Sequence, residues 1–227
     1  MIQEFGYILI HGFGGDVSEV QALADYLTSN GCQTVCPKLK GHTGKRNDLK
    51  GVTYQDWVVS VEDELFKLQK EIDRIVLVGF SMGGLIALNL SLKYQISALI
   101  TINTPIYFWD IKRIAKNIIS DIQKGELKNT QRYLHSSTSL PFEALMNFRI
   151  FLDKTKPLLP QIKCPIFVLQ GKDDDVVRHQ SADYIFNKVA SEIKLMKYYD
   201  NSGHTMLKSP VAHQAIGDID SFLKTLL

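Results

Sequence analysis

A serine between two glycines is the residue of this chain best suited to act as a nucleophile. The run is GFSMG at 79–83, which directly follows the apolar stretch 75–78 and opens a segment of helical character. Such a run at a strand-to-helix junction predicts a nucleophile elbow, a sharp turn that lifts the serine clear of a sheet. Glycines are required because the turn brings two backbones together, and a side chain there would clash. We therefore predict that Ser81 is a nucleophile.

A second glycine-rich run, HGFGG at 11–15, follows the short apolar stretch 7–10. Backbone N–H groups stabilise the negative charge that develops on a carbonyl oxygen during acyl transfer, and glycines let a backbone approach that oxygen. The pattern predicts an oxyanion hole whose donors are the N–H groups of Phe13 and of Met82, the residue after the serine. The alternative interpretation is an ordinary glycine-rich turn between a strand and a helix.

A nucleophilic serine needs a base, and the chain contains six histidines. His204 lies in a turn-rich segment between the strand-like residues 194–199 and a final amphipathic segment. A histidine in a loop at the carboxyl end of a strand reaches a serine at the same edge of a sheet, so we predict that His204 is the base. His11, just before the glycines, is expected to order the oxyanion loop. The remaining histidines are expected to be surface or structural residues: His42, His135, His179 and His213.

A catalytic triad also needs a carboxylate that orients the histidine. Three adjacent aspartates, Asp173, Asp174 and Asp175, follow an apolar, strand-like stretch and compete for this role. Any of them gives the chain order nucleophile, acid, base, and we choose Asp174. Its two neighbours are expected to be exposed or to cap a following helix. The alternative for all three is a solvated acidic turn.

Strand-like and helix-like segments alternate along the chain, which is typical of a parallel sheet with helices on both faces. In such sheets ligands bind outside the carboxyl ends of the strands, where the predicted site residues would converge. Strands are expected near 6–10, 33–36, 74–79, 97–102, 165–170 and 194–199, and helices near 17–30, 54–70, 82–94, 178–189 and 210–226.

These motifs together resemble the α/β-hydrolase superfamily, and within it the carboxylesterase and monoacylglycerol lipase type. The resemblance covers roughly residues 5–227 and rests on HGFGG at 11–15, KGH at 40–42, GFSMG at 79–83, G-x-x-D-x-x-V at 171–177 and SGH at 202–204. It implies that the acid is the aspartate of G-x-x-D-x-x-V, which is Asp174 and not either neighbour. It also implies an α/β-hydrolase fold with a mostly parallel sheet of about six strands, helices on both faces and a helical cap.

Residues 105–160 match no specific family pattern, and the interval between the fourth and fifth expected strands is far longer than a crossover helix needs. We predict one domain over 1–227 in which 105–160 is an inserted cap above the serine, with apolar residues that line an acyl pocket. The alternative is a helix that packs its apolar stripe onto the domain. The stripe at the start of the interval consists of Ile111, Ile114, Ala115, Ile118, Ile119 and Ile122.

Composition narrows the class of protein. The 227 residues are 45% hydrophobic and 22% charged, as in one globular domain, and the net charge of +2 gives no reason to expect a nucleic-acid partner. No run approaches eighteen apolar residues, so we expect no integral membrane association and a cytoplasmic enzyme. Cys32, Cys36 and Cys164 lie in or beside apolar segments and are expected to be reduced.

The reaction expected is hydrolysis of a small-molecule carboxyl ester through an acyl-serine intermediate, without a metal or an organic cofactor. The acyl group would be short or medium in length, or the substrate a monoacylglycerol. A thioesterase, an amidase or an acyltransferase uses the same groups, so these alternatives stay open. An alternative of another class is a ligand-binding protein that keeps the triad but hardly turns over. The sequence does not predict an oligomeric state.

Overall fold

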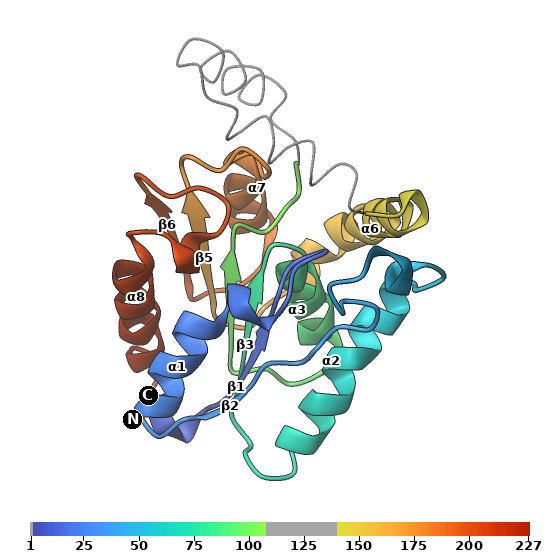
Figure 1. Ribbon diagram of the computed structural model, residues 1–227. Helices are drawn as coiled ribbons and strands as arrows, with labels where there is room; N and C mark the ends of the chain where they lie inside the picture. Colours follow the sequence, from blue (N-terminus) through green and yellow to red (C-terminus); the bar gives the residue numbers. More distant parts are fainter. Residues whose placement is uncertain (1, 108–139) are drawn as a thin grey trace.

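A six-stranded parallel sheet lies at the centre of the molecule, seen in a computed structural model that describes residues 2–107 and 140–227 (Figure 1). The strand order is β2-β1-β3-β4-β5-β6, and each neighbouring pair is parallel. All six strands expected from the sequence are present, within two residues of their expected ends. They are β1 (Gly6–Ile10), β2 (Gln33–Val35), β3 (Ile75–Phe80), β4 (Ala98–Ile102), β5 (Ile166–Gly171) and β6 (Lys194–Tyr199).

Different helices cover the two faces of the sheet. The described helices are α1 (Gln21–Ser29), α2 (Tyr54–Leu68), α3 (Met82–Lys93), α6 (Phe142–Thr155), α7 (Gln180–Lys188) and α8 (Ala212–Lys224), with short 3-10 turns η1 (Ile2–Glu4), η2 (Val17–Glu19), η3 (Arg46–Leu49), η4 (Lys156–Gln161) and η5 (Met206–Lys208). Helices α1 and α8 share one buried cluster with Leu9 and Val78. Helices α2, α3, α6 and α7 share the other with Ile10 and Leu77. Figure 1 accordingly shows α1 beside α8 on one side and α2 and α3 on the other.

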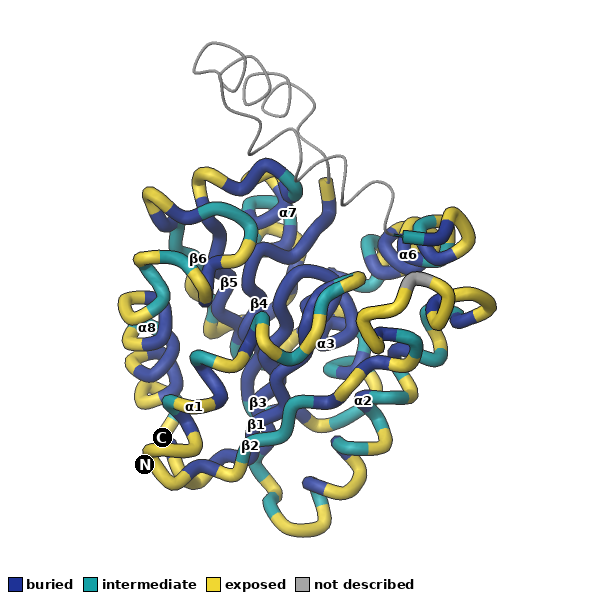
Figure 2. Tube along the Cα trace, viewed as in Figure 1, coloured by how far each residue is buried: buried dark blue, intermediate teal, exposed yellow. Residues whose placement is uncertain are grey.

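Burial follows the position of each strand in the sheet. Every residue of β1, β3, β4 and β5 is buried, because helices cover both faces of these central strands. The edge strands β2 and β6 are largely intermediate or exposed. Figure 2 shows the same contrast, with a buried sheet and exposed outer surfaces on the helices. The continuous apolar runs in the sequence thus correspond to the central strands.

The strand order reverses between β1 and β3. The chain passes from β1 outward to β2 and then crosses to β3 on the other side of β1. The register aligns the carboxyl ends, since Ile10 pairs with Gly79 and Phe80 pairs with Ile102. Loops that leave adjacent strands in opposite directions open a crevice at this edge, which is where ligands bind in parallel sheets. The fold therefore brings both glycine-rich runs to one place.

Helix α6 lies near the carboxyl end of the interval 105–160, which was predicted to be a cap. It packs against α2 and α3, and its Phe151 and Leu152 are buried in the core. The apolar stripe at 111–122 lies outside the described residues, as does His135. The assignment of 105–160 as a cap stays a prediction.

Two further sequence features can be located. Cys32 is buried, Cys36 and Cys164 are partly buried, and all three are free thiols. Within the two described ranges, no helix combines the length and the apolar character needed to cross a membrane.

Candidate active site

Ser81 lies on a strained turn between β3 and α3. Its backbone has φ 52° and ψ −121°, a conformation that few residues other than glycine adopt. A Cβ atom on Gly79 would lie 2.3 Å from the carbonyl oxygen of Gly83, and one on Gly83 would lie 2.2 Å from that of Ile10. The Ser81 N–H donates to the carbonyl of Ile102 at 2.9 Å, which ties the turn to β4. The turn has the geometry of a nucleophile elbow, and only glycine fits on either side of it.

Three side chains from separate strand ends form a connected chain of hydrogen bonds. His204, in the loop after β6, has its Nε2 atom 3.1 Å from Ser81 Oγ. Its Nδ1 atom is 2.8 Å from Oδ2 of Asp174, which follows β5. The His204 side chain is 19% exposed and that of Asp174 is fully buried. The structure thus brings Ser81, His204 and Asp174 together at hydrogen-bonding distance.

The surroundings of Asp174 determine which imidazole nitrogen carries the proton. Its Oδ1 atom accepts the N–H groups of Val176 and Val177, each at 2.8 Å, so Oδ2 is directed at His204. A carboxylate accepts, hence Nδ1 of His204 donates and the neutral ring presents Nε2 as an acceptor to Ser81. This is the tautomer that can remove a proton from the serine.

The two aspartates next to Asp174 differ from each other in how far they are exposed to solvent. Asp173 is exposed, as expected. Asp175 is only 3% exposed, so the expectation that it would be exposed was wrong. It does not cap α7 either, because the residue at that N-cap is His179. Asp175 instead contributes to the electrostatic environment of His204.

The pKa of His204 reflects two opposing effects. Burial alone would lower the pKa, because it penalises the charged imidazolium. The charge and hydrogen bond of Asp174, together with the charges of Glu19 and Asp175, more than offset burial, and the pKa is raised above 6.5. The site therefore favours the imidazolium that forms when His204 accepts a proton.

The two predicted oxyanion donors lie on either side of Ser81. Met82 is the first residue of α3, so its N–H has no acceptor within that helix. Phe13 lies in the loop after β1, and its N–H makes no hydrogen bond within residues 2–107 and 140–227. A Cβ atom on Gly12 would lie 3.2 Å from the Cβ of Ser81, so this loop passes directly beside the serine. Both N–H groups are available to a ligand.

His11 and His42 lie behind the loop as neutral, buried side chains. The Nε2 atom of His11 accepts the N–H of Leu39 at 3.3 Å, so its Nδ1 atom donates to the carbonyl of Gly12 at 2.9 Å. Burial lowers the pKa of His11, and burial lowers that of His42 to about 4. His11 thus holds the backbone of the glycine-rich loop without carrying charge.

An apolar wall adjoins the loop. The ring of Phe13 stacks on Phe148 of α6, with centroids 5.3 Å apart and planes within 6°, and also contacts Trp57. On the other side, a Cβ atom on Gly14 would lie 2.8 Å from a methyl group of Leu140. Segment 140–155 therefore contacts the glycine-rich loop. Phe148 and Leu140 lie within the interval 105–160 that was predicted to be a cap, whereas the sequence alone did not assign Trp57 to the site.

Asn103 is a further residue that sequence reasoning missed. It follows β4, is fully buried and has φ 48°. Its Nδ2 atom donates to the carbonyls of Gly203 at 3.1 Å and His204 at 2.5 Å, and its Oδ1 atom accepts the N–H of Gly171 at 2.7 Å. Asn103 thereby joins the loop that carries His204 to the end of β5. Its partners are 68 to 101 residues away, so no local pattern marks it.

Replacing Asn103 with alanine is expected to lower the free energy of unfolding by about 2–4 kcal/mol, because one buried N–H group and two partly buried carbonyl groups lose their partner. Urea denaturation measures this loss. Asn201→Ala is the matched control, since Asn201 has φ 57° but is exposed. It should lose only about 1 kcal/mol from the unfavourable backbone conformation. Equal losses in the two variants would show that the hydrogen bonds of Asn103 contribute little.

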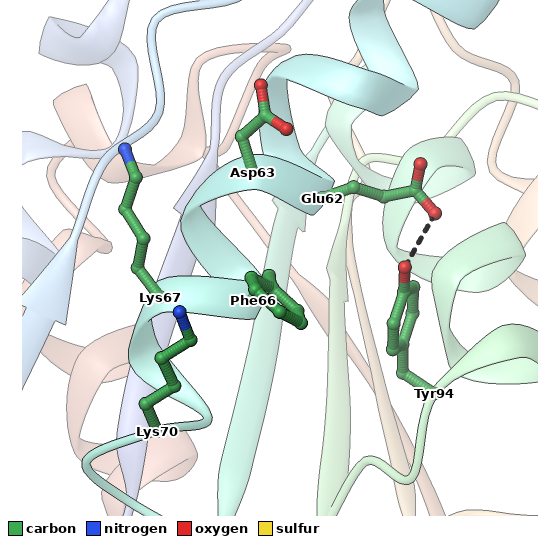
Figure 3. A pocket seen from close by; sticks show the side chains of 6 residues that line it. All are labelled: Glu62, Asp63, Phe66, Lys67, Lys70 and Tyr94. Carbon is green, nitrogen blue, oxygen red and sulfur yellow. Dashed lines mark hydrogen bonds between the residues drawn. The ribbon is translucent and has the colours of Figure 1, made fainter.

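A surface hollow elsewhere lacks the groups found around Ser81. It holds about 490 Å³ and lies between the outer face of α2 and the end of α3 (Figure 3). Of its lining residues, Tyr94 donates to Glu62 at 3.0 Å, and Lys67 donates to Glu64 at 2.7 Å. Tyr94 caps the carboxyl end of α3, about 20 Å along the helix from Ser81. The lining residues are Glu62, Asp63, Phe66, Lys67, Lys70 and Tyr94.

Known proteins with similar sequences are hydrolytic enzymes. The model of the alpha/beta hydrolase family matches residues 7–213. The chain is 30% identical over 208 residues to the thermostable monoacylglycerol lipase of Bacillus sp. (strain H-257), and the aligned region covers 88% of this chain and 82% of that protein. It is 25% identical over 226 residues to the carboxylesterase of Bacillus subtilis (strain 168), which covers 96% of this chain and 92% of that protein.

Solved structures show the same fold. The structure reported for the metagenome-derived lipolytic enzymes LipS and LipT superposes with a TM-score of 0.82 at 18% identity, over 98% of this chain and 94% of that one. A soluble variant of the monoglyceride lipase from Saccharomyces cerevisiae gives a TM-score of 0.73 at 22% identity, over 97% and 86%. The fold expected from the sequence is confirmed. The family model, the relatives and the parallel sheet agree, and the chain belongs to the alpha/beta hydrolase family.

Proposed function

We propose that this protein is a serine hydrolase that cleaves carboxyl esters through an acyl-serine intermediate. The observation that carries the proposal is the continuous chain of hydrogen bonds from Ser81 Oγ through His204 to Asp174, at 3.1 and 2.8 Å. The names of the two sequence relatives, a monoacylglycerol lipase and a carboxylesterase, support ester hydrolysis. No step of the proposed reaction requires a metal or an organic cofactor.

The first half of the reaction forms the acyl-serine. Ser81 Oγ attacks the carbonyl carbon while its proton passes to Nε2 of His204, and the carbonyl electron pair moves onto oxygen. The N–H groups of Phe13 and Met82 donate to this oxyanion. When the intermediate collapses, the bond to the alcohol oxygen breaks, and the alcohol leaves with the proton from His204. Asp174 stabilises the imidazolium throughout.

The second half releases the acid. Water gives a proton to His204 Nε2 and attacks the acyl carbon. The bond to Ser81 then breaks, and Oγ recovers its proton from the imidazolium, so that the site returns to its starting state. Each half uses the same two N–H donors, because both halves pass through an oxyanion of the same geometry.

The apolar wall supports a substrate with an uncharged acyl chain. Phe13 and Phe148 stack beside the loop that carries one oxyanion donor, and Leu140 lies against Gly14. A short or medium acyl chain, or that of a monoacylglycerol, would bury apolar surface there. We propose that segment 105–160 is the cap that completes this acyl pocket. We also propose that the enzyme is cytoplasmic.

A fluorophosphonate probe tests the proposed nucleophile, because it phosphonylates only an activated serine. We expect one adduct, on Ser81, when the purified protein is labelled and its peptides are analysed by mass spectrometry. His204→Ala should label much more slowly, since the proton of Ser81 then has no acceptor. A folded wild-type protein that is not labelled would contradict the proposal and would favour a ligand-binding protein of low turnover.

A substrate panel then distinguishes the remaining alternatives. Nitrophenyl esters of short and medium chain length, monoacylglycerols, acyl thioesters and anilides share the acyl group but differ in leaving group. We expect ester hydrolysis to have the highest kcat/KM. A clear preference for thioesters or anilides would instead identify a thioesterase or an amidase with the same three residues.

A further inference from the structure

Glu19 places a carboxylate directly behind the oxyanion loop. It is the last residue of the short helix η2, and Oε2 accepts the Gly12 N–H at 2.8 Å. Asp16 caps the start of η2 by accepting the N–H of Ser18 at 2.8 Å, which fixes the turn that carries Glu19. A Cβ atom on Gly15 would lie 2.2–2.4 Å from the carboxyl group. The carboxylate thus occupies space that exists because the loop contains glycines.

The same carboxylate lies close to the reacting groups. A Cβ atom on Gly12 would lie 3.2 Å from Glu19 Oε2 and 3.2 Å from the Cβ of Ser81. Because both atoms lie 3.2 Å from the same point, Glu19 Oε2 and Ser81 Cβ are at most twice 3.2 Å apart. Glu19 is partly buried, so solvent screens its charge only incompletely.

Two hydrogen bonds determine where the Phe13 N–H points. The peptide group is planar, so the Gly12 carbonyl and the Phe13 N–H point in opposite directions. His11 Nδ1 donates to that carbonyl at 2.9 Å and orients this peptide plane. Glu19 accepts the N–H of Gly12 and orients the plane before it. The Gly12 N–H is thus bonded to Glu19, while the Phe13 N–H beside it has no acceptor among the residues that the structure describes.

The charges around the two groups favour mutual stabilisation. His204 faces Asp174, Glu19 and Asp175, all of which raise its pKa against the effect of burial. Glu19 faces His204, Lys208 and Asp16. Burial is the largest effect and raises the pKa of Glu19 above its ordinary value, and the charge of Asp16 acts in the same direction, while the Gly12 N–H, His204 and Lys208 limit the rise. An ionised Glu19 therefore favours the imidazolium form of His204.

We propose that Glu19 is a positioning residue of this site, which holds the glycine-rich loop through Gly12 and adds its negative charge to those of Asp174 and Asp175 near His204. Its role in turnover rests on the proposed function. The carboxyl group acts through Gly12 and His204 and does not touch the substrate.

Two substitutions separate the roles of shape and charge. Glu19→Gln keeps an oxygen acceptor for the Gly12 N–H but removes the charge. We expect kcat on a nitrophenyl ester to stay within about threefold above about pH 8, and the acidic limb of kcat/KM to move to lower pH. Glu19→Ala removes both the acceptor for the Gly12 N–H and the charge. We expect kcat to fall about 10- to 100-fold and KM to change less than about threefold. The reason is that a wrongly oriented Phe13 N–H weakens binding of the transition state more than binding of the ester. Glu64→Gln removes one partly exposed charge, which pairs with Lys67 on α2, and should leave both quantities unchanged.

NMR titration of the His204 ring supplies a readout without turnover. We expect its pKa to be lower in Glu19→Gln than in the wild-type protein, and unchanged in Glu64→Gln. An unchanged pKa in Glu19→Gln, or a folded Glu19→Ala variant with wild-type kcat, would overturn the inference. If Glu19→Ala does not fold, the NMR titration and the pH profile of Glu19→Gln still test the proposed role of Glu19. A wild-type protein without esterase activity would contradict the proposed function, while the titration would still test the charge of Glu19.

Discussion

Replacing Ser81 with alanine is expected to lower kcat for ester hydrolysis by about 10⁶-fold, the loss seen when the nucleophile of a comparable triad is removed. Alanine provides no oxygen for the acyl-enzyme, while the oxyanion donors and the apolar wall still bind the ester. A residual rate above that of water alone is therefore expected. Steady-state kinetics with a nitrophenyl ester measure the loss, using protein purified on unused resin so that no wild-type enzyme contaminates the assay.

The fold should survive this change. Alanine would keep the backbone of the elbow, and the substitution removes only one side-chain hydrogen bond, the 3.1 Å contact between Ser81 Oγ and His204. Thermal unfolding should therefore shift by only a few degrees. Ser221→Ala is the control for serine removal, because Ser221 is exposed on α8 and bonds only within that helix. A folded Ser81→Ala variant with a rate within about tenfold of wild type would contradict a nucleophilic role for Ser81.

Replacing Asp174 with asparagine is expected to lower kcat by about 10⁴-fold, the loss that the corresponding change causes in a chymotrypsin-type triad. The hydrogen bonds of this site explain why. Val176 and Val177 both donate to Oδ1 and would keep the amide oxygen of asparagine in that position. The amide NH₂ group would then face His204 and require Nδ1 as an acceptor. The ring proton would move to Nε2, which could no longer accept the proton of Ser81.

The neighbouring aspartates provide the controls for this prediction. Asp173→Asn changes an exposed residue and should leave kcat nearly unchanged. Asp175→Asn removes a buried charge that acts on His204 from a distance, so a smaller loss than for Asp174 is expected. Nitrogen chemical shifts of the imidazole would report the tautomer directly. If Asp175→Asn greatly lowered kcat while Asp174→Asn left kcat nearly normal, the carboxylate of the triad would have to be assigned to Asp175.

The elements of the sheet were predictable because their signals are local. β3 was expected near 74–79 and is found at Ile75–Phe80, since a run of buried apolar residues in front of a glycine has few other interpretations. The same holds for the elbow, where the close approach of Gly79 and Gly83 to other backbones explains the motif. The predicted triad residues lie within hydrogen-bonding distance because parallel strands end at one edge of the sheet.

Residues that act through distant contacts were not predictable in this way. Asn103 follows β4 as an ordinary polar residue in the sequence, and only the sheet brings it to Gly171 and His204. Burial of Asp175 likewise depends on packing that a run of three aspartates does not reveal. Glu19 is different, because it lies only seven residues from its partner Gly12. An acidic residue just after a glycine-rich loop was the available signal.

The order of the strands also affects what happens while the chain is being synthesised. Ser81 precedes His204 by 123 residues, and His204 follows the last strand of the sheet. A nascent chain that ends after β4 contains Ser81 but neither Asp174 nor His204. We expect its serine to stay unreactive toward cellular esters until β6 and the following loop have been made, because no imidazole is present to accept its proton.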